Sequence, residues 1–390
     1  MTKEQLFTLE NLNNAFYETA KISQWKESTQ RYNANLLPNN IKLQDELLNG
    51  KYKIRPTTDF QLNERGKIRH IEAPAIQDRI VQKILCQNIL IPELTKPLIY
   101  DNYASLKNRG TTFARKRLDV LLGRYIRKNG SDGYILKIDI KKYFESIDHN
   151  ILKRMVHERI KEPLDVMNLI DYIIDTASHA DKGLNLGSEA PQIFAIFYLS
   201  PLDTYIKTVK GMKYYGRYMD DMFIISDSKE ELKALLNEIK NQLALLKLKV
   251  NEKKTLLTKL SHGFTYLQIK YNVDGNKIIK RPTRDKIVRE RRRLKKFKNL
   301  YDEGEMTEDK IYNCYMSWRN GLKKDCNHCQ KTIETMDKLY NSLFPEHKKT
   351  RKKKRKELID EAFRDYDENL YGKFNRNANY RTIGIAGEGI

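Results

Sequence analysis

Tyr218-Met219-Asp220-Asp221 lies between two short runs of apolar and aromatic residues, 213–218 and 222–226. These runs predict two strands joined by a tight turn that presents a pair of carboxylates. Upstream, the strand-like run 134–139 ends in a third carboxylate, Asp139. Carboxylate oxygens are ligands that Mg²⁺ prefers, and two such ions about 3.5–4 Å apart serve in-line phosphoryl transfer. An Asp-Asp pair is also a common turn dipeptide, but the strand context and the third carboxylate favour a metal site.

The chain is strongly basic, with a formal net charge of +22 on 390 residues. Such an excess favours a polyanionic partner, above all nucleic acid. A membrane surface is the alternative, but no long basic amphipathic anchor, transmembrane run or signal-peptide core is visible. Four cysteines are too few for a disulfide framework, which indicates a reducing compartment. We therefore expect a cytoplasmic protein without a membrane anchor that binds nucleic acid.

Hydrophobic periodicity indicates that helices and hairpins are mixed along the chain. It predicts helices over 4–30, 40–50, 76–91, 192–205 and 229–247, and two helices over 151–178 that break near Pro163. Hairpins are expected around 63–67 and around Asp274-Gly275, because both segments carry turn residues between strand-like runs. Beyond Pro282 the pattern is helical and basic. The fold class expected from this pattern is α+β.

Two motifs resemble those of retroelement-type reverse transcriptases. Residues 137–149, Lys-Ile-Asp-Ile-Lys-Lys-Tyr-Phe-Glu-Ser-Ile-Asp-His, look like the first catalytic motif of that family, and Tyr218-Met219-Asp220-Asp221 is similar to the second. The resemblance spans nearly the whole chain. It implies a right-hand polymerase with N-terminal helices and fingers in 1–130, a palm in 131–281, a helical thumb in 282–347 and a basic tail in 348–390. Finger helices would be inserted in the palm at 150–180, and the antiparallel palm sheet would carry the three aspartates.

The resemblance also implies roles at the catalytic centre. Asp139 and Asp220 would be the main ligands of two Mg²⁺ ions, which Mn²⁺ can replace, and Ile140 would also belong to the metal site. Asp221 would either ligate weakly or hold the turn. All three aspartates are catalytic candidates.

Further resemblances concern the incoming nucleotide. Phe144 matches the position of a sugar gate, where an aromatic ring leaves no room for a 2′ hydroxyl; a core phenylalanine is the alternative. Lys67 and Arg69, on the expected fingers hairpin, match triphosphate contacts, because cations suit phosphate, although an ordinary solvated face would look similar. Lys254 resembles a lysine that neutralises or protonates the leaving pyrophosphate.

Residues 186–192, Leu-Gly-Ser-Glu-Ala-Pro-Gln, point to a subgroup. Most family members have glutamine and proline where this chain has Leu186 and Gln192, whereas the enzymes of diversity-generating retroelements have an aliphatic residue and glutamine. The tract 315–323 also resembles the thumb of that subgroup, but Pro191 departs from its usual serine. An antiphage-defence reverse transcriptase is the alternative. Leu186 offers only packing to the incoming nucleotide, which predicts low fidelity, unless it is simply a core residue.

The function expected from this resemblance is RNA-directed DNA polymerase, making cDNA from an RNA encoded at the same locus of a bacterium or phage. The expected partners are an RNA template, a DNA or RNA primer, dNTPs, a noncoding RNA and an accessory protein. Nicking and template removal are expected to come from partners, since no further nuclease or integrase domain is apparent. An inactive RNA-binding scaffold is a rival, but all three aspartates are present.

Two remaining features concern charge and cysteine. The run 348–356 is expected to be an exposed arm that contacts nucleic-acid phosphates or docks a partner. Its basic residues are Lys348, Lys349, Arg351, Lys352, Lys353, Lys354, Arg355 and Lys356. Cys326-Asn327-His328-Cys329 with Cys314 contains zinc-ligand residue types, but the spacing fits no standard zinc pattern.

Overall fold

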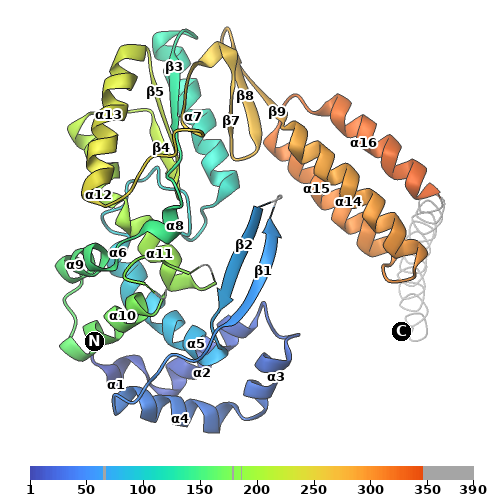
Figure 1. Cartoon of the computed structure of the whole chain (residues 1–390). Coiled ribbons are helices and arrows are strands. Elements are labelled where there is room, and N and C mark those ends of the chain that lie inside the picture. Colours follow the sequence, from blue (N-terminus) through green and yellow to red (C-terminus); the bar gives the residue numbers. More distant parts are fainter. Residues whose placement is uncertain (65–66, 178–179, 186, 346–390) are drawn as a thin grey trace, which may run out of the picture. The chain divides into compact units, whose positions relative to one another are not determined.

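The computed structural model describes residues 1–345 apart from 65–66, 178–179 and 186, and the chain divides into two compact units. Unit 1 contains residues 1–267 and 271–278, and unit 2 contains 268–270 and the chain from 279 onward. The described part combines helices with antiparallel strand pairs (Figure 1). The α+β class is therefore confirmed.

Unit 1 begins with a group of short helices rather than the continuous helix expected over 4–30. The elements are α1 (Lys3–Leu6), α2 (Leu9–Ala20), α3 (Glu27–Ala34) and α4 (Leu36–Leu48). The prediction was wrong because Thr8 starts a new helix: its side chain accepts a hydrogen bond from the backbone N–H of Asn11. Apolar periodicity alone does not reveal such a break.

A hairpin of two seven-residue strands follows these helices. β1 (Thr58–Glu64) pairs antiparallel with β2 (Lys67–Ala73), as expected for this segment. After the hairpin come α5 (Ile76–Leu85), a π-helical turn (Cys86–Leu90), α6 (Ile91–Leu94) and α7 (Thr111–Asn129). The helix α7 was not predicted. It buries Leu118, Leu121 and Leu122 on one face while presenting many charged residues on the other.

The central sheet of unit 1 has four strands in the order β4-β5-β3-β6. They are β3 (Tyr134–Ile138), β4 (Tyr215–Tyr218), β5 (Asp221–Ser226) and β6 (Leu256–Lys259). β3 pairs with β5 on one side and β6 on the other, so the two segments that resemble family motifs lie on adjacent strands. Helix α7 packs against β4, and α13 (Lys229–Leu245) packs against β5 (Figure 1).

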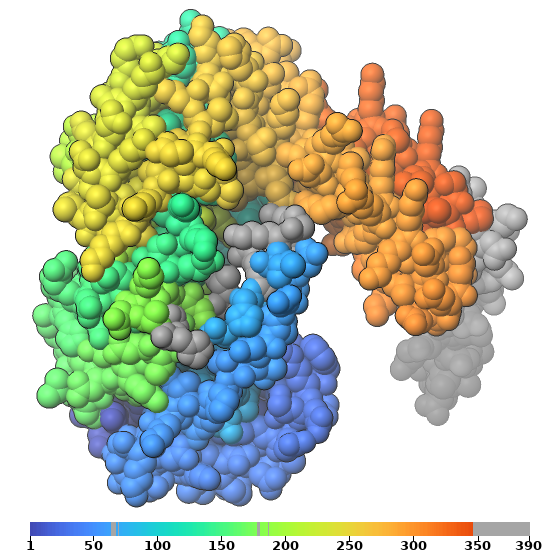
Figure 2. Space-filling model, in the orientation of Figure 1, coloured from blue at the N-terminus to red at the C-terminus, as the bar shows by residue number. Residues whose placement is uncertain are grey.

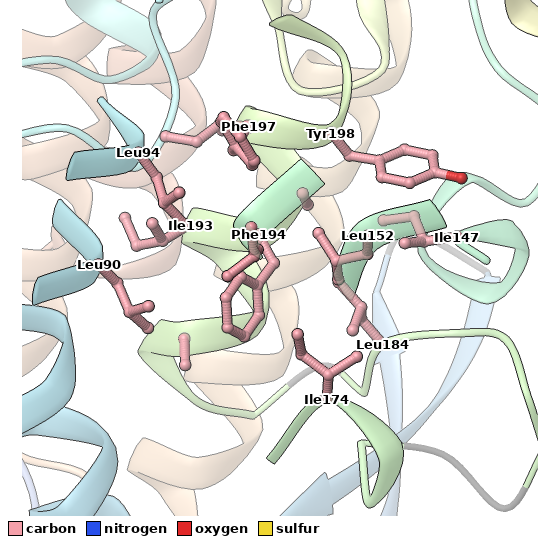
Figure 3. Packing of buried hydrophobic residues seen from close by; sticks show 14 of the residues in the cluster. Leu90, Leu94, Ile147, Leu152, Ile174, Leu184, Ile193, Phe194, Phe197 and Tyr198 are labelled. Atoms are coloured by element: carbon pink, nitrogen blue, oxygen red, sulfur yellow. The ribbon is translucent and has the colours of Figure 1, made fainter. Parts of the chain in front are cut away.

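The segments between β3 and β4 are helical: α8 (Tyr143–Ser146), α9 (His149–Arg159), α10 (Leu164–Asp175), α11 (Glu189–Tyr198), α12 (Ser200–Thr204) and a π-helical turn (Tyr205–Val209). The predicted break near Pro163 is confirmed, because Pro163 is the N-cap of α10. Helix α11 is buried on nearly every side and anchors the largest apolar core (Figure 3). Burying each large apolar side chain contributes about 1.5–3 kcal/mol, so this core holds the helices against the sheet.

A second sheet has the order β7-β8-β9, formed by β7 (Phe264–Tyr266), β8 (Ile269–Asp274) and β9 (Lys277–Pro282). The predicted hairpin at Asp274-Gly275 is confirmed. Unit 2 continues with α14 (Arg284–Asp302), α15 (Glu308–Asp325) and α16 (Gln330–Leu343). Their shared core includes stacked rings of Tyr315 and Tyr340, with centroids 4.6 Å apart. None of the described helices combines the length and apolarity that crossing a membrane requires.

Candidate active site

The predicted turn is present between β4 and β5. β4 ends at Tyr218, β5 begins at Asp221, and Met219 adopts a left-handed backbone with φ of 53°. The antiparallel register pairs Ile138 with Met222. Extending this register by one residue places Asp139 opposite Asp221. The structure thus brings the two sequence motifs together at one end of the sheet.

Asp139 is held by two side chains that follow α13. Its Oδ1 accepts a hydrogen bond from Asn251 Nδ2 at 2.8 Å, and its Oδ2 accepts one from Lys254 Nζ at 2.9 Å. Lys254 is largely exposed, so this ion pair is readily broken. Sequence reasoning placed Lys254 near the leaving group, but it missed Asn251.

Asp221 is paired with Lys137, whose Nζ lies 3.4 Å from Oδ1. Burial raises the pKa of Asp221 to about 6; Lys137 opposes this shift, and the charges of Asp220 and Asp139 reinforce it. The charges of Asp139 and Asp220 therefore act unfavourably on the ionised carboxylate of Asp221. Lys137 partly offsets that repulsion, and a bound cation would offset it further.

The donor atoms suit Mg²⁺, since they are carboxylate oxygens concentrated at one end of a sheet. Among the described residues, however, no three His, Cys, Asp or Glu side chains are already gathered around a common metal position. Mg²⁺ commonly binds through one or two carboxylates and takes its other ligands from substrate phosphates and water. Asp139, Asp220 and Asp221 fit that mode of binding, in which the nucleotide completes the site.

A buried arginine forms a hydrogen bond with the backbone of the turn. Arg217, on β4, donates from Nη1 to the carbonyl oxygen of Met219 at 3.1 Å and pairs with Asp203 of α12. Sequence reasoning missed this contact. The available signal was an arginine inside an otherwise apolar strand next to the Asp220-Asp221 pair.

The expected nucleotide-binding residues are only partly described. Phe144, on α8, is half-buried, and its ring meets Tyr143 edge-on with centroids 5.7 Å apart. Gln192 is exposed on α11, where its Oε1 accepts a hydrogen bond from Ser105 Oγ at 2.8 Å. Lys67 and Arg69 belong to β2, but their side chains are outside the described part of the chain.

Two other predicted regions also fall outside the described residues: Leu186 and the basic run 348–356. The glycine that follows Leu186 is described. A Cβ on Gly187 would lie 2.5 Å from the carbonyl oxygen of Glu72, so only glycine allows this loop to approach β2 so closely.

The cysteine-rich turn gathers no three metal-ligating side chains within the described part of the chain. Cys326 and Cys329 are buried, and burial raises the pKa of Cys326 to about 12. The sulfur of Cys329 donates to the carbonyl oxygen of Cys326.

An antiparallel sheet with three aspartates at one end is the arrangement expected for a metal-dependent nucleotidyltransferase. Residues 56–271 match the family described as reverse transcriptase (RNA-dependent DNA polymerase). The chain belongs to this family. The predicted resemblance to retroelement-type enzymes and the predicted enzyme class, an RNA-directed DNA polymerase, are thereby confirmed.

Two curated relatives are similar to this chain. Protein YkfC of Escherichia coli (strain K12) is 25% identical over 284 residues, which cover 62% of this chain and 71% of YkfC. The putative COX1/OXI3 intron 2 protein of Saccharomyces cerevisiae is 25% identical over 178 residues, which cover 43% of this chain and 19% of the yeast protein.

Solved structures with similarity include two telomerases. Apo telomerase from Candida tropicalis, truncated from the C-terminal domain, has a TM-score of 0.46 and 16% identity, over 62% of this chain and 60% of that one. Telomerase from Candida albicans, in complex with a fragment of telomeric RNA, has a TM-score of 0.46 and 12% identity, over 75% of this chain and 61% of that one. This chain therefore spans less than two thirds of either telomerase.

Proposed function

We propose that this chain makes cDNA by Mg²⁺-dependent nucleotidyl transfer from deoxynucleoside triphosphates, using an RNA encoded at its own locus as template. The observation that supports this most directly is the placement of Asp139 opposite the Asp220-Asp221 turn. This placement offers carboxylate oxygens from two adjacent strands to the same small region. The family membership supplies the reaction class.

In this reaction the primer 3′ oxygen bonds to the α phosphorus of the nucleotide, while the bond from that phosphorus to its bridging oxygen breaks. The hydroxyl proton passes to solvent, and pyrophosphate leaves. Bound Mg²⁺ would supply charge stabilisation for the attacking and leaving oxygens. Asp139 and Asp220 are the proposed ligands, with Asp221 as a weaker one or as a turn residue.

The surrounding side chains have positioning roles in this proposal. Asn251 orients the carboxylate of Asp139 through the 2.8 Å hydrogen bond. Lys254 balances the charge of Asp139 until metal and nucleotide arrive, and it is then available to the leaving phosphate. Phe144 lies five positions after Asp139 on a half-buried helix, where an aromatic ring can exclude a 2′ hydroxyl. Lys67 and Arg69 are proposed to contact the triphosphate.

The proposed biological role is target diversification within a diversity-generating retroelement, with a noncoding RNA and an accessory protein as partners. Leu186 and Gln192 support this role because they match that subgroup. Pro191 departs from the subgroup, and this departure favours the alternative of antiphage defence. Residues 348–356 are proposed to contact RNA phosphates in either case.

The reaction is tested by primer extension on a defined RNA template. Purified chain, labelled primer, dNTPs and Mg²⁺ should give full-length cDNA, whereas chelation of the metal should stop synthesis. A matched reaction with ribonucleotides tests sugar choice. If the chain binds template and primer but adds no nucleotide at any Mg²⁺ or Mn²⁺ concentration, it is an RNA-binding scaffold rather than a polymerase.

The proposed role in target diversification is tested by measuring how accurately the chain copies its template. Leu186→Gln should lower misincorporation opposite template adenine about fivefold, since a polar contact discriminates better than apolar packing. The matched control is Leu256→Gln on β6, because Leu256 is exposed. Leu184 is buried in the core and is therefore unsuitable for the control. Accurate copying by the wild type, unchanged by Leu186→Gln, would favour defence. Sequencing the nucleic acid that copurifies with the chain identifies the template.

A further inference from the structure

A basic cavity in unit 1 is lined in part by residues that closely follow Asp139 in the sequence. It is a cavity of about 330 Å³ lined by five lysines, Lys141, Lys142, Lys182, Lys247 and Lys249, together with Ser146 and Asp148. All five lysines are exposed. In Figure 2, yellow surface, the colour of α13 and of the segment that follows it, adjoins the green surface of the α8–α9 region. We call this cavity the lysine pocket.

Three separate chain segments build the lysine pocket. Lys141 and Lys142 follow β3, and Lys247 and Lys249 follow α13. Lys182 forms an isolated antiparallel bridge with Asp148 at the start of α9. Residues distant in sequence thus converge on one place, which distinguishes the pocket from a run of lysines along a single solvated helix.

The charges in the lysine pocket are poorly balanced. The carboxylate of Asp148 is paired with Lys247 at 2.6 Å, and Glu145, outside the lining, is paired with Lys142 at 3.2 Å. Among the described lining residues, five lysines thus accompany one carboxylate. Gathering like charges in this way is unfavourable without an anion, and phosphate is an anion that lysine commonly binds.

The backbone of two of these lysines is also unusual. Lys142 has a φ of 49° and Lys247 a φ of 53°, in the left-handed region that disfavours residues with a Cβ. Glycine would adopt both conformations more easily. The fold nevertheless places lysine at both turns, which supports a functional role for the two ammonium groups.

Backbone hydrogen bonds join the segments that line the lysine pocket to the segments that carry Asp139 and Asn251. Ile140 bridges Val250, with hydrogen bonds from Lys141 N to Lys249 O at 2.9 Å and from Asn251 N to Asp139 O at 2.7 Å. Lys141 is two residues from Asp139, and Lys249 is two residues from Asn251, on the two segments that this bridge joins.

We propose that the lysine pocket binds small oligophosphates and receives the pyrophosphate that nucleotidyl transfer releases beside Asp139. This inference rests on the proposed function, because transfer from a nucleoside triphosphate is what produces pyrophosphate there. The backbone of a nucleic acid offers the same phosphate chemistry. The two sources are separated by probing with pyrophosphate and with oligouridylate.

The test uses the full chain and titration calorimetry with sodium pyrophosphate in metal-free buffer. The pocket variant Lys182→Gln/Lys249→Gln should bind pyrophosphate about tenfold more weakly than the wild type. The control variant Lys229→Gln/Lys233→Gln removes the same charge from exposed lysines in the first turns of α13, about 18–24 Å along the helix from its C-terminal end. It should bind as the wild type does.

Two results would overturn the inference. One is equal pyrophosphate affinity in the pocket and control variants. The other is a loss of oligouridylate affinity in the pocket variant with pyrophosphate affinity retained, which would make these lysines a nucleic-acid contact. Primer extension by the wild type, measured without added pyrophosphate, tests the proposed function separately. A chain that extends primers, but whose pocket variant binds pyrophosphate normally, contradicts this inference alone.

A second measurement follows product inhibition during primer extension, with each protein compared with its own uninhibited rate. The pyrophosphate concentration that halves the rate should rise about tenfold in the pocket variant and stay unchanged in the control variant. An equal inhibitory concentration in both variants would also overturn the proposal.

Discussion

Arg217 and Asp203 form an ion pair in which both side chains are 0% exposed. The guanidinium donates from Nε to Oδ1 at 2.8 Å and from Nη2 to Oδ2 at 2.5 Å. It also donates to the carbonyl oxygens of Ile196 at 2.9 Å and Met219 at 3.1 Å. One buried cation therefore connects two helices to the turn that presents Asp220.

Arg217→Met should destabilise the chain by about 3–5 kcal/mol, because it leaves the carboxylate of Asp203 buried without its cation. The free energy of unfolding, measured in urea, reports this loss. Arg31→Met is the matched control: its partner Glu27 is 81% exposed, so the cost should stay below about 1 kcal/mol.

A double variant separates the buried charge from the packing. Arg217→Met/Asp203→Leu removes both charges and should recover part of the stability lost in Arg217→Met. Equal stability of Arg217→Met and Arg31→Met would mean that the buried pair does not hold the turn.

Lys254→Ala should lower the Mg²⁺ concentration needed for half-maximal primer extension by up to about fivefold, because the ammonium group competes with cations for Asp139. The rate at saturating Mg²⁺ should fall as well, since the leaving phosphate loses a positive group. Lys253→Ala, at the neighbouring exposed position, is the control. An identical Mg²⁺ requirement in both variants would show that the ion pair in the structure does not affect metal binding.

Phe144→Ala should raise the incorporation of ribonucleotides relative to deoxynucleotides, because it makes room for a 2′ hydroxyl. We expect about a tenfold or larger change in the ratio of kcat/KM values for the two sugars. Phe144→Tyr keeps the ring and should keep the preference. A ratio that is the same for Phe144→Ala and the wild type would place Phe144 in the core only.

The sequence predicted local features well where short-range signals decide the structure. The Tyr218–Asp221 turn and the helix start at Pro163 depend on a few adjacent residues, and both are present. The α7 helix was missed because many charged residues interrupt its apolar face. The break at Thr8 depends on a side-chain cap that periodicity does not register.

The site could be predicted only in part, for a different physical reason. Asp139, Asp220 and Asp221 stand out by their strand context, whereas their supporting contacts join distant parts of the chain. Asn251 is 112 residues from Asp139, and the partner of Lys137 lies on another strand. Such pairings follow from the register of the folded sheet, and a single sequence does not specify them.

The most direct test of the active site is Asp220→Asn in RNA-templated primer extension. The substitution keeps the shape of the side chain and removes its charge, so the rate should fall at least about 100-fold, as when a charge-stabilising group is lost. Asp227→Asn, an exposed carboxylate just after the other end of β5, is the control and should extend at the wild-type rate. The free energy of unfolding and RNA binding should match the wild type in both variants. Extension by Asp220→Asn at near the wild-type rate would contradict the assignment of the active site.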